Sequence, residues 1–195
     1  MRINLKTSDI ELLAQSITSG DRKAIANGIT LVESTKKEDR ALSEQLLDKL
    51  KTSTNDSIRI GISGPPGVGK STFIEALGHP ILETGEHLAI LAIDPSSSIS
   101  GGSILGDKTR MESLSRSDNT FIRPSPSGGN LGGVNQSTRE SICILEAAGY
   151  SVILVETVGV GQAETEVFEM TDIFLVLLNP GGGDELQGIK RGIIE

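Results

Sequence analysis

The spacing of hydrophobic positions along the chain changes near residue 56. Before that point, apolar residues recur every three or four positions, as they do on one face of an α-helix. Such spacing occurs over residues 10–17, 24–32 and 42–50 and predicts a helical extension covering residues 1–55. From residue 58 onwards, short uninterrupted apolar runs alternate with helical patterns, which is typical of parallel strands that are buried on both faces.

These mainly apolar runs have the length of strands. They cover residues 58–63, 88–94, 151–156 and 173–178, with a weaker run at 120–123. Helices are expected from about residue 70 to 77, over 136–149 and from 187, with a loop around a short helix over 95–118. The first of these helices is expected to end at Pro80, because the residue before a proline disfavours the helical conformation. The alternation predicts an α/β domain over residues 56–195, with a parallel sheet covered by helices on both faces.

A complete phosphate-binding loop follows the first predicted strand. Residues 64–71 read Gly-Pro-Pro-Gly-Val-Gly-Lys-Ser and fit the pattern G-x-x-x-x-G-K-[ST]. Its glycines let successive N–H groups point at phosphates, and the helix that starts near Lys70 directs its positive end at the same oxygens. Lys70 is suited to bridging the β- and γ-phosphates. The predicted nucleotide-binding residues are Gly64, Pro65, Pro66, Gly67, Val68, Gly69, Lys70, Ser71 and Thr72.

Acidic residues at strand ends are the expected partners of Mg²⁺ beside such a loop. Glu156 ends an apolar run at the Walker B position, and Asp94 ends another at the sheet edge where ligands of open α/β folds bind. Asp107 lies in the loop that follows Asp94. The predicted metal ligands are Ser71, Asp94, Asp107 and Glu156, and the predicted catalytic residues are Lys70, Asp94, Asp107 and Glu156.

The sequence after Glu156 limits the hydrolytic mechanism. The Gly159 N–H is expected to contact a γ-phosphate and to sense its loss. Small GTPases place a glutamine immediately after this glycine to orient the attacking water, but this chain has Val160 there. Because a valine cannot position water, we predict slow intrinsic hydrolysis that depends on a partner or on a loop rearrangement.

Composition excludes several other classes of function. A net charge of −8 and a pI near 4.9 argue against sequence-independent nucleic-acid binding. The sequence contains no apolar stretch long enough to cross a membrane and no secretory signal. Its one cysteine rules out an intrachain disulfide and favours a reducing compartment. We therefore expect a cytoplasmic protein.

Several longer strings resemble one family of GTPases. Residues 94–111 resemble its switch I region, and residues 122–126, 131–134, 156–162 and 183–190 also match. Together with the helical extension, these strings resemble the methylmalonyl-CoA mutase-associated GTPases (the MeaB, ArgK and MMAA type). The resemblance implies a Mg²⁺-dependent GTPase that binds GTP and GDP. It further implies a chaperone of an adenosylcobalamin-dependent acyl-CoA mutase, which gates cofactor loading and protects the mutase.

The resemblance also raises expectations about the rest of such a protein. Residues 181–190 are implied to form a third switch that faces the partner, and full-length relatives are implied to form homodimers through a C-terminal arm. GTPases of this kind carry an Asn-Lys-x-Asp motif after the last predicted strand, and none occurs before Glu195. We therefore expect a fragment or a truncated reading frame that lacks the dimerisation arm and binds nucleotide with poor base selectivity.

Two other interpretations stay open. The same phosphate loop would serve a nucleotide-dependent kinase or a transport-associated ATPase of the ArgK type, although no histidine lies near the motifs to act as a base. A non-hydrolysing nucleotide-binding module is the second alternative. Nickel-insertion GTPases share the acid in the third motif but usually add Cys/His clusters, for which one cysteine and two histidines leave little material.

Overall fold

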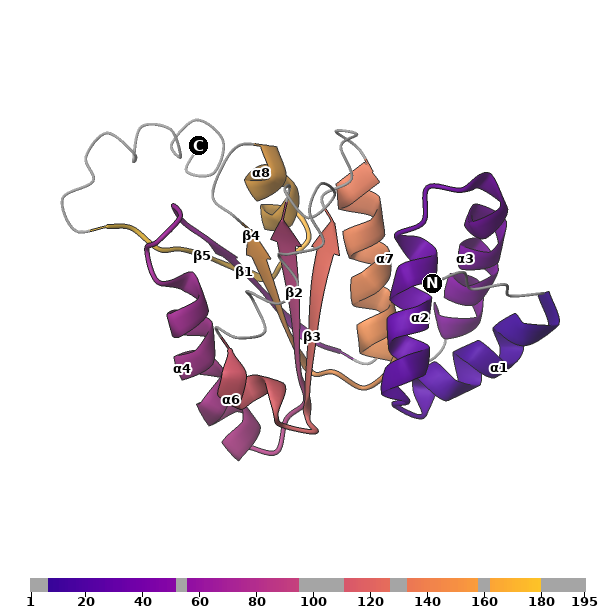
Figure 1. Ribbon diagram of the computed structural model, residues 1–195, viewed down its shortest axis with the longest axis horizontal. Helices are drawn as coiled ribbons and strands as arrows, with labels where there is room; N and C mark the ends of the chain where they lie inside the picture. The colour runs from indigo at the N-terminus through magenta and orange to yellow at the C-terminus, as the bar shows by residue number, and fades with distance from the viewer. Residues whose placement is uncertain (1–6, 52–55, 95–110, 127–132, 158–161, 180–195) are drawn as a thin grey trace. The chain divides into compact units, whose positions relative to one another are not determined.

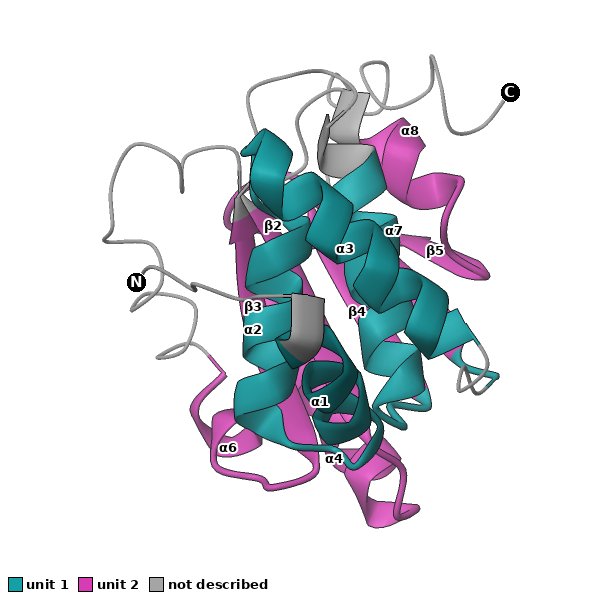
Figure 2. Ribbon diagram, turned by 90° about the vertical axis from the view of Figure 1, so that its right-hand side faces the viewer, with its two compact units in different colours: residues 1–57, 136–151 teal, residues 58–135, 152–195 magenta. Residues whose placement is uncertain are grey.

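The computed structural model describes residues 7–51, 56–94, 111–126, 133–157 and 162–179 (Figure 1). It divides into two compact units (Figure 2). Unit 1 comprises residues 1–57 and 136–151, and unit 2 comprises residues 58–135 and 152–195. Residues 136–151 thus group with the N-terminal helices, whereas the predicted boundary at residue 56 assigned them to the nucleotide domain. That domain boundary stays a prediction.

Unit 1 is helical. It contains α1 (Thr7–Thr18), α2 (Arg22–Val32), α3 (Lys37–Leu50) and most of α7 (Gly133–Ala147). The periodic apolar positions form its core, with Ile10, Ile17, Ile25, Ile29, Leu46, Leu50, Ile144 and Leu145 almost fully buried. Packing is tight at Gly28, where a Cβ atom would lie 2.9 Å from the Cδ1 atom of Ile17. The three predicted N-terminal helices are therefore confirmed.

Unit 2 is built on a five-stranded sheet. The strands are β1 (Ile58–Ser63), β2 (Leu88–Asp94), β3 (Thr120–Pro126), β4 (Val152–Thr157) and β5 (Ile173–Val176), in the order β3-β2-β4-β1-β5 (Figure 1). Every pairing is parallel. Parallel neighbours need crossover connections, which the intervening helices provide. The predicted parallel α/β sheet is confirmed.

Helices cover both faces of this sheet. On one face, α4 (Lys70–Glu83) and α6 (Glu112–Ser115) enclose a core of Ile62, Ile74, Leu88, Ile90, Met111, Leu114, Val152 and Leu154. On the other face, α8 (Gln162–Phe168) lies close to β1, since a Cβ atom at Gly61 would meet the Val167 side chain at 3.0 Å. The strands present alternate side chains to the two faces.

The boundaries of two elements differ from the predictions. Helix α4 continues through Pro80 to Glu83 instead of ending before the proline. A proline within a helix removes a hydrogen bond, but Ile81 and Leu82 pack against the apolar core and hold the last turn in place. Strand β3 extends to Pro126 and includes two prolines, which are tolerated because β3 lies at the edge of the sheet. The helix predicted from residue 187 lies outside the described residues.

Candidate nucleotide-binding site

The phosphate loop connects the end of β1 to the start of α4 (Figure 1). Strand β1 lies between β4 and β5, so the loop emerges from the interior of the sheet at its carboxyl edge. Ligands of open parallel sheets bind at this edge. The backbone reverses within the loop, where the Val68 N–H donates to the Pro65 carbonyl oxygen at 3.3 Å.

All three glycines of the loop, Gly64, Gly67 and Gly69, have positive φ angles that a side chain would oppose. Gly69 has φ 99° and is the N-cap residue of α4, so the helix begins from a left-handed residue. Gly64 has φ 149°, and a Cβ atom there would lie 2.5 Å from the Leu177 carbonyl oxygen. The glycine pattern in the sequence is thus explained by backbone angle at Gly69 and by close approach at Gly64.

The Lys70 side chain folds back over the loop that precedes it. Its Nζ atom donates to the Gly64 carbonyl oxygen at 2.7 Å and to the Pro65 carbonyl oxygen at 3.2 Å. The residue is only 8% exposed although its side chain is charged. Buried charges require paired or hydrogen-bonded surroundings, and these two carbonyls supply part of them. The ammonium group is therefore held against the loop.

The first turn of α4 adds oriented backbone donors. Lys70, Ser71 and Thr72 open the helix, and their N–H groups precede the first residue that has an intrahelical acceptor. Phe73 is that residue, and its N–H donates to the Gly69 carbonyl oxygen at 2.9 Å. Such a helix start, combined with a glycine-rich loop, is a site for phosphate oxygens. Ser71 and Thr72 retain exposed surface there.

Glu156 lies beside the start of the loop. It pairs in register with Ile62 of β1 and with Ala92 of β2, and it is half-buried. Glu156 lies two residues after Leu154, which belongs to the core under α4, and residues two apart on a strand share a face. Glu156 therefore projects toward the face that α4 covers. The structure thus places this carboxylate on the same side of the sheet as Lys70.

The other predicted site residues are described only partly or not at all. Asp94 is the last residue of β2, where its backbone is level with Pro126, but its side chain is outside the described part of the structure. Asp107 and Gly159 lie outside the described residues. The roles predicted for the phosphate loop, the three acids and Gly159 stay predictions.

The donor set fits Mg²⁺. Within the described ranges, no group of three or more His, Cys, Asp or Glu residues is arranged to hold a metal ion. Mg²⁺, however, is typically bound by one or two carboxylates, water and substrate phosphates rather than by a protein cage. The Ser71 hydroxyl and the Glu156 carboxylate offer oxygen atoms of this type.

The site also contains two residues that the sequence did not predict. The Ser63 hydroxyl donates a hydrogen bond to Oε1 of Glu164 on α8, and both residues are buried. Ser63 immediately precedes the phosphate loop. The sequence offered no signal for this contact, because a serine at the end of an apolar run and a glutamate in a first helical turn are each common on their own.

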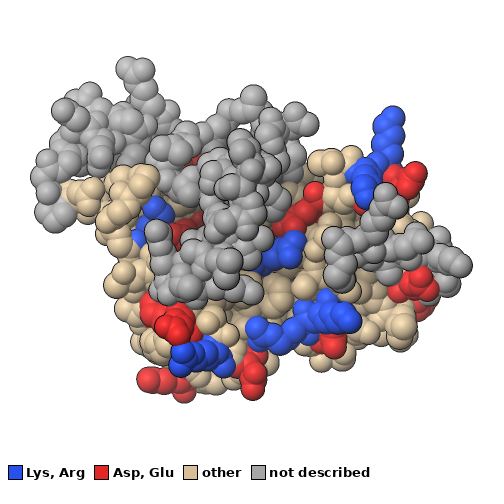
Figure 3. All heavy atoms as spheres, viewed as in Figure 1, with Lys and Arg blue, Asp and Glu red and all other residues tan. Residues whose placement is uncertain are grey.

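The charged surface and the helices add two further observations. On the face shown in Figure 3, described Lys and Arg side chains are interspersed with described Asp and Glu side chains. The described side chains therefore form no broad surface of one sign on this face (Figure 3). None of the described helices is long and apolar enough to cross a bilayer.

The chain is similar in sequence to several known proteins. The family described as "Methylmalonyl Co-A mutase-associated GTPase MeaB" matches residues 25–195. A "Putative GTPase" of Caulobacter vibrioides is 58% identical over 187 residues, which cover 96% of this chain and 57% of that protein. The mouse "Methylmalonic aciduria type A homolog, mitochondrial" is 52% identical over 196 residues, covering 95% of this chain and 47% of that protein.

A solved structure is also similar. The crystal structure named "LAO/AO transport system kinase" superposes with a TM-score of 0.73 at 39% identity, covering 90% of this chain and 52% of that chain. The present chain thus spans about half the length of the relatives that it matches.

Proposed function

Because the chain belongs to the family of methylmalonyl-CoA mutase-associated GTPases, we propose that it binds GTP and GDP with Mg²⁺ and hydrolyses GTP to GDP and phosphate. The observation that carries this proposal is the Lys70 ammonium group, which is buried against the phosphate loop and donates to the Gly64 carbonyl oxygen. A lysine held in this way supports a role in binding the β- and γ-phosphates of a nucleotide.

Each predicted residue has a defined task in this mechanism. The loop amides and the first N–H groups of α4 donate to phosphate oxygens, and Lys70 adds a positive charge where negative charge develops during transfer. Ser71 and Glu156, with Asp94 and Asp107, would hold Mg²⁺ or its waters. When bound, the metal would supply positive charge that offsets the negative charge of the phosphates. The protein thus acts by positioning and by electrostatic stabilisation.

Hydrolysis by the isolated chain is proposed to be slow. Gly159 would contact the γ-phosphate through its N–H, but the next residue is Val160, which has no group to orient water. A partner or a rearranged loop would supply the missing group. A turnover in the range of a typical kinase, about 1–100 s⁻¹, from the purified chain would contradict this.

The proposed partner is an adenosylcobalamin-dependent acyl-CoA mutase of the methylmalonyl-CoA type. The family description names an association with methylmalonyl-CoA mutase, which supports this choice. We propose that nucleotide hydrolysis gates cofactor loading and protects the mutase, with residues 181–190 facing the partner. A cytoplasmic location and a homodimer in the longer relatives belong to the same proposal.

A nucleotide-dependent kinase or a transport-associated ATPase is the second candidate. One observation favours it, namely that the similar crystal structure bears the name of a transport system kinase. A kinase would transfer the γ-phosphoryl group to an acceptor, whereas a GTPase releases it as inorganic phosphate. Phosphate release therefore separates a GTPase from a kinase, and release from GTP rather than from ATP separates a GTPase from an ATPase.

The first experiment tests binding. Fluorescent guanine and adenine nucleotide analogues are titrated in Mg²⁺ buffer into the wild-type chain, Lys70→Ala and Lys51→Ala. Lys51 is a matched control because it is an exposed lysine in unit 1. We expect Lys70→Ala to weaken binding at least about tenfold, since it removes a charged donor to phosphate. Unchanged affinity in Lys70→Ala would refute the proposed site.

The second experiment tests the reaction and the partner. Phosphate release from GTP and from ATP is measured with and without a purified acyl-CoA mutase. We expect slow release from GTP that increases when the mutase is present. Release from ATP alone, or no response to the mutase, would favour the transport-associated ATPase. A chain that binds nucleotide but never releases phosphate would be a binding module.

A further inference from the structure

The last residue of β1 makes a buried contact with α8. The Ser63 hydroxyl donates to Oε1 of Glu164, and the two residues are 0% and 6% exposed. An ionised carboxylate loses its hydration when it is buried, so such a group persists only where hydrogen bonds compensate. This hydrogen bond lies directly before the phosphate loop, so it is in a position to influence the loop as well as the packing of α8.

The contact continues from Ser63 into the nucleotide site. Ser63 is bonded to Gly64, and the Gly64 carbonyl oxygen accepts the hydrogen bond from Lys70 Nζ at 2.7 Å. On the other side, the Ser63 carbonyl oxygen accepts from the Leu177 N–H at 2.8 Å. Glu164 therefore holds the side chain, and Leu177 the backbone, of the residue that presents the loop to Lys70.

A second buried polar group lies at the same place. Because Glu156 pairs with Ile62, the next residue of each strand brings Thr157 beside Ser63 on the face away from α4. Thr157 is 1% exposed, and its hydroxyl has no hydrogen-bond partner among the described residues. Two buried polar side chains, those of Ser63 and Thr157, thus lie on neighbouring strands directly before the phosphate loop.

We propose that Glu164 is a positioning residue for nucleotide binding, which acts through Ser63 to hold the first peptide of the phosphate loop and thereby the Lys70 ammonium group. This inference rests on the proposed nucleotide-binding function and deepens it. Glu164 also lies in the first turn of α8, where an acidic residue stabilises a helix. A helix-stabilising role alone would change unfolding but would leave nucleotide affinity unchanged.

The test uses Glu164→Ala, Ser63→Ala and the double variant, with Glu166→Ala as the control from the same helix. Affinities for fluorescent GDP and GTP analogues are measured in Mg²⁺ buffer, and thermal unfolding is followed in parallel. We expect each single variant to bind both analogues roughly three- to tenfold more weakly than wild type. The double variant should bind nucleotide about as well as whichever single variant binds more weakly, because both substitutions remove the same hydrogen bond.

The conservative variant Glu164→Gln adds a readout specific to the hydrogen bond. Its side-chain oxygen still accepts from Ser63, so we expect affinity within about twofold of wild type. A Gln variant as weak as the Ala variant, or singles that melt earlier but bind normally, would overturn the inference. If Glu164→Ala does not fold, Ser63→Ala decides, since it deletes one oxygen atom.

The same data separate this inference from the proposed function. If wild type binds nucleotide, Lys70→Ala loses it and Glu164→Ala does not, only the inference about Glu164 is wrong. If wild type itself binds no nucleotide, the proposed function fails and the inference fails with it.

Discussion

Gly64 lies against Leu177 so closely that a Cβ atom at the glycine would be 2.5 Å from the Leu177 carbonyl oxygen. The obstructing atom belongs to the backbone and cannot rotate away. This contact joins the start of the phosphate loop to the residue that follows β5. The position of the loop is thus set by the strand beside it as well as by its own glycines.

We expect Gly64→Ala to weaken GTP binding at least about tenfold and to destabilise the chain by about 1–3 kcal/mol, because the methyl group displaces the loop and the φ of 149° opposes a side chain. Isothermal titration and urea unfolding measure the two effects. The control is Gly85→Ala, where φ is 86° but no atom lies within 4 Å of the new Cβ. It should lose stability and keep its nucleotide affinity. Equal binding by both variants would contradict this account of the loop.

Glu156→Gln tests the carboxylate beside the loop. Replacing it with a neutral amide should weaken Mg²⁺-dependent GTP binding and phosphate release on the order of 10–100-fold, the usual effect of losing a carboxylate that orients a metal site. Binding measured in excess chelator should change little, because the loop amides and Lys70 remain. Phosphate release at a series of Mg²⁺ concentrations provides the measurement. An unchanged Mg²⁺ dependence would show that Glu156 has only a structural role.

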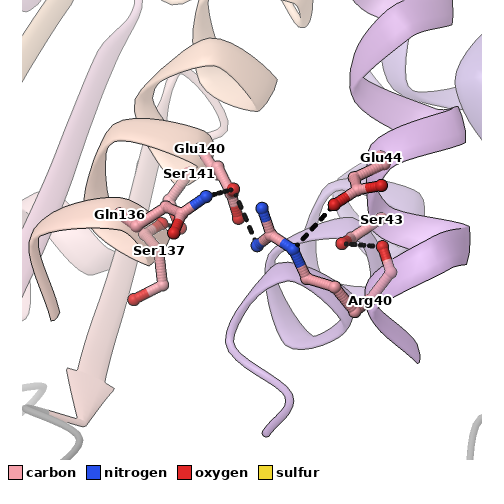
Figure 4. Close-up of polar contacts among 7 residues, drawn as sticks. All are labelled: Arg40, Ser43, Glu44, Gln136, Ser137, Glu140 and Ser141. Atoms are coloured by element: carbon pink, nitrogen blue, oxygen red, sulfur yellow. Dashed lines mark hydrogen bonds and ion pairs between the residues drawn. The ribbon is translucent and has the colours of Figure 1, made fainter. Parts of the chain in front are cut away.

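Glu140 on α7 is held by a polar network within unit 1 (Figure 4). Its Oε1 atom accepts from Arg40 Nη1 at 3.0 Å and from Gln136 Nε2 at 3.1 Å, while its buried Oε2 has no partner among the described residues. Arg40 also donates from Nε to the exposed Glu44 at 3.0 Å. Burial lowers the pKa of Arg40, but the Glu140 and Glu44 carboxylates raise it by more, so the guanidinium stays charged.

We expect Arg40→Ala to cost about 1–3 kcal/mol, because it leaves the Glu140 carboxylate buried with one donor fewer. Glu44→Ala should cost less than about 0.5 kcal/mol, since its pair with Arg40 is exposed to solvent. The double variant Arg40→Ala/Glu140→Ala should recover part of the loss. Urea unfolding of the three variants supplies the comparison, and equal costs for Arg40→Ala and Glu44→Ala would count against a buried network.

Tyr150 gives a pH-dependent prediction. Burial raises the pKa of its phenol above the usual 10, and nearby Arg22 lowers it by less. Because the folded state favours the neutral phenol, its contribution to stability is complete below the unfolded pKa and is lost as pH rises through the folded pKa. Above about pH 10, the unfolding free energy of wild type should therefore fall relative to that of Tyr150→Phe.

The chain contains one tyrosine and no tryptophan, so phenolate absorbance reports on Tyr150 alone. The titration should lie at higher pH in the folded chain than in urea. Coincident folded and unfolded titrations would mean that the phenol is hydrated in the native protein.

The sequence by itself determined the elements that depend on local pattern. The phosphate loop and the five strands follow from glycine spacing and from short apolar runs, and the structure contains these strands at or near the predicted positions. The end of α4 was predicted wrongly, since a proline rule is local, whereas Pro80 is kept helical by the packing of Ile81 and Leu82.

Only the tertiary structure decided which distant residues support the loop. Ser63 and Glu164 are 101 positions apart, and Gly64 meets Leu177 only because β5 pairs with β1. Periodicity specifies which face of an element is buried, but the order β3-β2-β4-β1-β5 determines what that face contacts. Strand order is a global property of packing. For this reason the sequence predicted the phosphate loop but did not predict its contacts with Glu164 and Leu177.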